Sequence, residues 1–134
     1  MLNKKKYNEI IKNNMNVNIP YSYLDNHKDR FIYINNYINR LYVNNRTNVR
    51  ILDYGSHTGI MGVLLSNLGF NVECCDLKEV IDKYEVNYSS NEIQYKFIIG
   101  DEPLPYEVDH FDLVIFTEIL EHLHKSPIEK LNDI

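Results

Sequence analysis

The stretch that decides the fold is Val49-Arg50-Ile51-Leu52-Asp53-Tyr54-Gly55-Ser56-His57-Thr58-Gly59. Its apolar, β-favouring first residues are typical of a strand that is covered on both faces. We expect the strand to end at Asp53 and the chain to turn sharply at Gly55, because glycine allows backbone angles that a Cβ would block. A helix should follow, with Thr58 as its cap and with free N–H groups at its N-terminus that attract an anion. The apolar face of this helix would consist of Met61, Leu64, Leu65 and Leu68.

The rest of the chain alternates between helical and strand patterns. Residues 23–42 carry apolar side chains at helical spacing, and residues 80–86 predict a short helix. Residues 70–75, 93–99 and 111–116 predict the second, third and fourth strands. This alternation predicts an α/β fold with a Rossmann-like, doubly wound parallel sheet. In such a sheet, ligands bind beyond the carboxyl ends of the strands, where the strand order reverses.

Residues 51–59 resemble the first motif of class I S-adenosylmethionine (SAM) dependent methyltransferases. That motif runs strand, acid, any residue, Gly, any residue, Gly, any residue, Gly, and His57 stands where the middle glycine is expected. A dinucleotide fingerprint would need glycine in place of both His57 and Ile60, and a P-loop would need Gly, Lys and Ser/Thr from position 60 onward. The turn therefore fits a SAM-type loop better than an NAD or ATP loop.

The resemblance implies SAM as the cofactor and a set of residues that hold it. Asp76 closes the second strand, where an acid in a Rossmann-like unit accepts hydrogen bonds from ribose hydroxyls. Asp101, after the third strand, is the candidate for the adenine amino group, and His27 and Arg30 are candidates for the methionine carboxylate. The expected cofactor-binding residues are Asp53, Gly55, Ser56, His57, Gly59, Asp76, Leu77, Asp101, Glu102, Thr117 and Glu118.

Residues 117–123 resemble a segment that many small-molecule and glycan-associated methyltransferases carry after the fourth strand. Glu121 and His122 are the candidates for a general base that takes a proton from the acceptor, which contributes about 10²–10⁴-fold. Small-RNA 3′-end methyltransferases use a similar Glu-x-x-Glu-His, here Glu118, Glu121 and His122, to hold a divalent metal. We favour the metal-free interpretation, because a further ligand histidine is not identifiable and the net charge is -5.

The length of 134 residues predicts one domain. Residues 1–20 are interpreted as a polar arm or a short helix, and residues 21–134 as a single SAM-binding methyltransferase domain. The resemblance covers roughly residues 27–134 and ends before the fifth strand of the family, so we interpret the domain as truncated at its C-terminus. The fourth strand would then be an apolar sheet edge, and we expect a homodimer or a partner chain to cover it.

Composition narrows the class of function. The acidic net charge argues against a basic nucleic-acid groove, and neither a membrane span nor a secretory pattern is present. Cys74 and Cys75 are adjacent, which excludes a disulfide framework and a zinc spacing and fits a reducing cytoplasm. The sequence predicts a cytoplasmic enzyme that methylates a small-molecule acceptor. The alternatives are a non-catalytic SAM-fold subunit that needs a partner, a different nucleotide-binding Rossmann domain and a metal-dependent RNA 3′-end 2′-O-methyltransferase.

Overall fold

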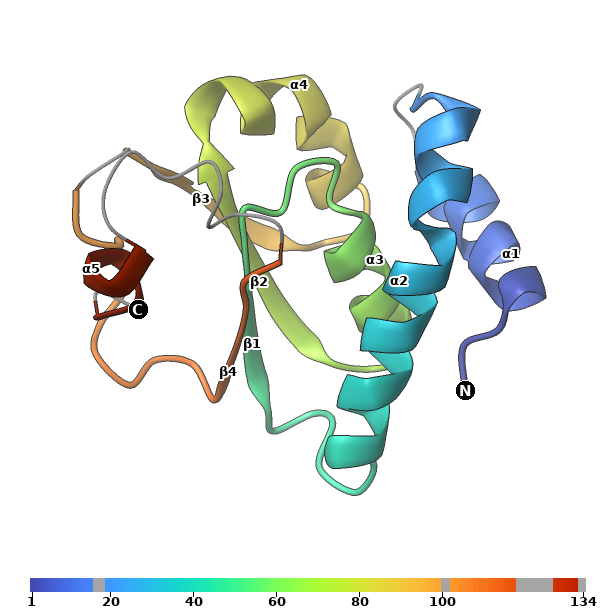
Figure 1. Cartoon of the computed structure of the whole chain (residues 1–134), viewed down its shortest axis with the longest axis horizontal. Helices are drawn as coiled ribbons and strands as arrows, with labels where there is room; N and C mark the ends of the chain where they lie inside the picture. Colours follow the sequence, from blue (N-terminus) through green and yellow to red (C-terminus); the bar gives the residue numbers. More distant parts are fainter. Residues whose placement is uncertain (16–18, 100–101, 118–126, 133–134) are drawn as a thin grey trace.

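A computed structural model describes residues 1–15, 19–99, 102–117 and 127–132 (Figure 1). The elements are α1 (Lys4–Asn14), α2 (Tyr21–Leu41), β1 (Arg50–Tyr54), α3 (Ile60–Asn67), β2 (Asn71–Leu77), α4 (Lys78–Ser89), β3 (Gln94–Ile98), β4 (Leu113–Ile115) and α5 (Pro127–Asn132). The strands form one sheet in the order β3-β2-β1-β4, and every pair is parallel. The predicted Rossmann-like, doubly wound sheet is confirmed.

β1 lies at the point where the strand order reverses. It pairs with β2 on one side and with β4 on the other, so Asp53 lies level with Cys74 and with Ile115. Four of its five residues are buried, as a central parallel strand requires. The carboxyl ends of β1, β2 and β4 therefore meet at the same edge, where the sequence predicts a ligand.

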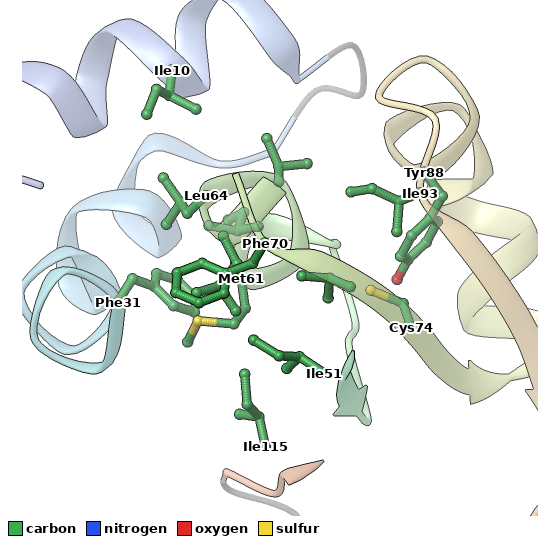
Figure 2. Packing of buried hydrophobic residues seen from close by; sticks show 14 of the residues in the cluster. Ile10, Phe31, Ile51, Met61, Leu64, Phe70, Cys74, Tyr88, Ile93 and Ile115 are labelled. Carbon is green, nitrogen blue, oxygen red and sulfur yellow. The ribbon is translucent and has the colours of Figure 1, made fainter. Parts of the chain in front are cut away.

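The main hydrophobic core lies between one face of the sheet and helices α1 to α4. Ile51 and Val63 are fully buried, and Phe31 of α2 packs near Met61 of α3 (Figure 2). The other face carries a smaller buried cluster of Leu52, Tyr54 and Cys75. Alternate residues of β1 thus point into two different cores, which is the two-residue period of a strand.

The N-terminal residues are a packed helix, and of the two sequence interpretations the polar arm is wrong. Tyr7, Ile10 and Ile11 of α1 are buried in the main core. Asn36 of α2 also holds the backbone of Leu2, donating to its carbonyl at 2.7 Å and accepting from its N–H at 2.8 Å. The polar composition of residues 1–20 suggests an arm, but the polar residues occupy one face of a helix whose other face is apolar.

Two helix starts differ from the predicted ones. α3 has Gly59 as its N-cap residue, with no side-chain cap, whereas Thr58 is buried and does not cap the helix. α2 begins at Tyr21 after Pro20, two residues ahead of the helical pattern at residues 23–42. Proline has a fixed φ and lacks an N–H, so it can begin a helix without a side-chain cap.

Within the described residues, no helix is both long enough and apolar enough to cross a membrane.

Candidate cofactor site

A cavity of about 300 Å³ lies beyond the carboxyl ends of β1 and β2. Its floor is formed by Asp53 at the end of β1 and by Asp76 near the end of β2. Tyr23, Arg30 and Phe31 of α2 form one wall. The turn between β1 and α3 contributes the residues from Gly55 to Thr58, and α3 itself contributes Ile60 and Met61. The remaining lining residues are Val80 and Thr117.

Asp53 is a buried carboxyl group that lines this cavity. The residue is 4% exposed, and its Oδ2 has no hydrogen-bond partner within the described residues. Burial raises the pKa of Asp53 to about 7, and the charge of Asp76 adds to the rise. A buried acceptor without a donor is costly, so this oxygen is suited to a cationic or hydrogen-bonding group of a ligand.

The turn after β1 is built from residues in the left-handed region. Gly55 has φ 72°, His57 has φ 49° and Gly59 has φ 82°. A Cβ at Gly59 would also approach Cε1 of Tyr88 to 3.1 Å, so this position needs glycine for two reasons. The middle position of the motif carries a left-handed backbone although it is histidine, which shows why a glycine is expected there.

The His57 ring lies among aromatic side chains. Its centroid is 5.6 Å from that of Tyr23 and 5.0 Å from that of Tyr84, and the Tyr23 hydroxyl lies 3.4 Å from Nδ1. Burial beside these groups lowers the pKa of the His57 imidazole, and Lys83 and His27 lower it further while Asp76 opposes them. The imidazole is therefore neutral at pH 7, and it reaches across the turn toward α2.

Asp76 connects the second strand to the turn. Its Oδ2 accepts a hydrogen bond of 2.8 Å from the backbone N–H of His57, and its Oδ1 accepts one of 2.8 Å from the N–H of Leu77. A carboxylate has about four lone-pair sites, so both oxygens keep room for a further donor. Asp76 thus holds the turn and still presents acceptors to the cavity.

The structure brings several predicted site residues to one cavity. These are Asp53, Gly55, Ser56, His57, Asp76 and Thr117, together with the carboxylate candidate Arg30. Gly59 lies behind the turn as the N-cap of α3, and Leu77, Glu102 and His27 are not among the residues that line the cavity. Asp101, Glu118, Glu121 and His122 lie outside the described residues.

Some residues at the site escape prediction from the sequence. Phe31 is an apolar position of the helical pattern at residues 23–42, and Tyr23 is its first residue. Nothing in their spacing indicates that they face a ligand. Asn87 and Tyr88, on α4, contact the turn from behind. Within the described residues, no cluster of three His, Cys, Asp or Glu side chains is placed to hold a metal ion.

The residues present fit SAM. Its ammonium and sulfonium groups are cations, which suit a cavity with Asp53 and Asp76 on its floor, and its carboxylate suits Arg30 on the wall. The ribose hydroxyls are donors for which Asp76 keeps acceptor sites. A ligand cavity commonly measures about 300–1,000 Å³, and this one is at the lower end.

Known proteins agree with this fit. The family described as a methyltransferase domain matches residues 27–134. The chain is similar to the Pyrococcus abyssi tRNA (uracil-54, C5)-methyltransferase in complex with S-adenosyl-L-homocysteine, with 25% identity and a TM-score of 0.53 over 77% of this chain and 25% of that one. It is also similar in fold to the PH0226 protein from Pyrococcus horikoshii OT3, with 23% identity and a TM-score of 0.55 over 98% of this chain and 57% of that one. No curated protein matches the chain by sequence.

The chain therefore spans a quarter of the first of these proteins and little more than half of the second. The family match, in contrast, extends over most of the chain and includes every strand of the sheet. Together with the strand order and the acidic cavity at the switch point, it shows that this chain belongs to the methyltransferase-domain family, with the Rossmann-like fold of class I SAM-dependent methyltransferases.

Proposed function

We propose that the protein transfers a methyl group from SAM to a small-molecule acceptor and that this chain holds the cofactor. The observation that carries the proposal is the buried Asp53 carboxyl, whose Oδ2 lacks a partner within the described residues and which lines the cavity just before the turn. A fold keeps such a group at a cost, and a ligand with a positive charge removes that cost.

When bound, SAM supplies a methyl group on a positively charged sulfur that leaves as a neutral thioether. The residues of the chain hold the cofactor and orient it in the cavity. Asp76 places negative charge at the floor of the cavity, Asp53 adds to it as it ionises near pH 7, and Arg30 places positive charge on the α2 wall. This distribution matches a ligand with cationic groups and a carboxylate, and it fixes the direction in which the ligand lies.

Orientation of the acceptor and the methyl group can account for much of the rate enhancement of methyl transfer. Holding an acceptor in line with the methyl group contributes up to roughly 7–11 kcal/mol, without a covalent intermediate on the protein. Removal of a proton from the acceptor is the remaining task, and we propose Glu121 or His122 for it. Both follow Thr117, which lines the cavity, by only a few residues of sequence.

A small-molecule acceptor is supported by charge and by resemblance. The net charge of -5 disfavours a polyanion, and residues 117–123 resemble a segment of small-molecule methyltransferases. The opposite indication comes from the Pyrococcus abyssi protein, whose acceptor is tRNA. An RNA acceptor is therefore the second candidate.

Two measurements test the proposal. Equilibrium dialysis should show binding of SAM and of its demethylated product, and no binding of NAD or ATP at the same concentrations. Transfer of labelled methyl groups should then appear in a small-molecule extract and not in total RNA. Labelled methyl groups in RNA would show that the acceptor is RNA and not a small molecule. SAM binding without methyl transfer to either the extract or the RNA would indicate the non-catalytic subunit. Failure to bind SAM would reject the proposal.

A further inference from the structure

The turn that forms the cavity is held from behind by two adjacent residues of α4. The Tyr88 hydroxyl donates to the carbonyl oxygen of His57 at 2.6 Å, and Asn87 Nδ2 donates to the carbonyl oxygen of Thr58 at 3.0 Å. Both side chains are fully buried, with exposed fractions of 0%. Figure 2 shows Tyr88 extending from α4 toward the Cys74 side of β2.

The hydrogen bonds of the Tyr88 hydroxyl have one consistent arrangement. Its single proton is used in the bond to the His57 carbonyl, so the Ser56 hydroxyl donates to Tyr88 at 2.8 Å, in preference to the more distant Cys75 carbonyl oxygen at 3.4 Å. Burial raises the pKa of Tyr88 well above its usual range, so the hydroxyl keeps its proton at neutral pH. Tyr88 thus bridges Ser56 and His57, two consecutive residues of the turn.

These contacts converge on the residue at which the motif departs from glycine. A left-handed backbone is disfavoured at a residue other than glycine, because its Cβ comes too close to the following carbonyl oxygen. At His57 the N–H is held by Asp76 and the carbonyl is held by Tyr88, so both ends of the residue are fixed from outside the turn. Tyr88 also packs against Gly59, where a Cβ would meet its ring.

We propose that Tyr88 and Asn87 are positioning residues, which hold the cofactor turn in its left-handed form and so compensate for the missing glycine at His57. This inference rests on the proposed function for its effect on SAM. Neither side chain lines the cavity, so their action on a ligand passes through the backbone of the turn. The geometry of the turn itself can be measured without any ligand.

The test compares Tyr88→Phe with Tyr95→Phe. Both variants keep the ring and remove a hydroxyl, but the Tyr95 hydroxyl bonds to Glu85, away from the turn, while its ring lies 5.5 Å from that of Tyr88. We expect Tyr88→Phe to weaken SAM binding by roughly three- to tenfold, as loss of one buried hydrogen bond implies. Tyr95→Phe should bind SAM as the wild type does.

Hydrogen exchange of the ligand-free chain provides the second reading. The amides of His57 and Gly59 are bonded to Asp76 and to the Ser56 carbonyl, and in Tyr88→Phe both should exchange several-fold faster than in the wild type. The amides of β1 should keep their rates, which a general loss of core stability would not allow. Equal acceleration in turn and sheet, or equal SAM affinity in the two Phe variants, would overturn the proposal.

The two proposals fail in different ways. If the wild type does not bind SAM, the proposed function is wrong, and exchange at His57 and Gly59 alone decides whether α4 holds the turn. If Tyr88→Phe does not fold, Asn87→Ala replaces it, with the same expected change in exchange and a smaller loss of affinity. Unchanged exchange in Asn87→Ala would then overturn the proposal.

Discussion

Asp53 illustrates a residue whose role depends on its burial. An aspartate at the end of a strand is ordinary, but here the carboxyl is enclosed, and its pKa is raised from 3.8 to about 7. Between pH 3.8 and about pH 7, Asp53 keeps its proton in the folded chain and has lost it in the unfolded chain. The contribution of Asp53 to stability therefore falls as the pH rises through this window.

Asp53→Asn removes this titration. We expect the variant and the wild type to differ little near pH 4, and the variant to be more stable by about 1–4 kcal/mol at pH 8, because the amide cannot ionise. Denaturant unfolding from pH 4 to pH 8 measures the difference. Parallel pH profiles for the two proteins would show that Asp53 has an ordinary pKa and is not the buried group described here.

Substitution of His57 tests how its side chain affects SAM binding. In His57→Gly the backbone bonds to Asp76 and Tyr88 remain, the left-handed φ costs nothing, and the ring no longer stands at the cavity. We expect SAM to bind several-fold more tightly. His57→Ala, which removes the ring but keeps a Cβ at positive φ, should fall between glycine and the wild type. Weaker binding in both variants would show that the imidazole is itself a ligand contact.

Among the elements, α3 lies close to β2 because Gly62 has no side chain. A Cβ at Gly62 would approach Cys74 Sγ to 2.8 Å, which a packed core cannot accommodate without a shift. Alanine gains about 1 kcal/mol of helix propensity over glycine, yet we expect Gly62→Ala to destabilise the chain by about 1–3 kcal/mol net. The clash should be specific to the sulfur.

The double variant tests that specificity. In a Cys74→Ala background the space beside Gly62 is open, so Gly62→Ala should be neutral or stabilising there. Thermal or denaturant unfolding of the four proteins gives the coupling between the two sites. The same loss of stability in both backgrounds would exclude the contact between Gly62 and Cys74 as its cause.

Elements were predicted well where their periodicity is strong. The strands near residues 51, 72, 95 and 114 and the helices between them follow from apolar spacing, and parallel pairing follows from the alternation. Helix starts were missed because Pro20 and Gly59 begin helices through backbone geometry, without a side-chain cap. The sequence leaves residues 1–20 as an arm or a short helix, because the few apolar residues of α1 pack partly against α3, which is distant in the sequence.

The part of the site that lies at the ends of the strands could be predicted from the sequence. Asp53 and Asp76 follow from the sheet topology, since the carboxyl ends of neighbouring parallel strands meet at one edge. The α4 contacts were not predictable, because tyrosine and asparagine at the end of a helix show no sign of the backbone atoms they reach. The double role of Asp76, toward the turn and toward the cavity, also needed the structure.

At the scale of the whole molecule, β4 is one of the two edge strands of the sheet in the described part of the chain, and β3 is the other. Within the described residues β4 pairs with β1 alone, and it is short and apolar. We propose that another chain covers this edge in solution, since an unpaired apolar strand offers a template for pairing. Light scattering of residues 1–134 should show a mass that rises with concentration. A monodisperse monomer at every concentration would contradict the proposal.

The central claim is that the cavity beyond β1 and β2 binds SAM through Asp76. Calorimetric titration of SAM into the wild type, Asp76→Asn and Asp76→Ala tests it most directly. Asparagine keeps an acceptor for the His57 N–H, whereas alanine loses both this bond and the ribose acceptor, each worth about 1.5–3 kcal/mol when charged. We predict that affinity falls from wild type to Asn to Ala, by a few kcal/mol in total. Equal SAM affinity in all three proteins, or no SAM binding by the wild type, would contradict the claim.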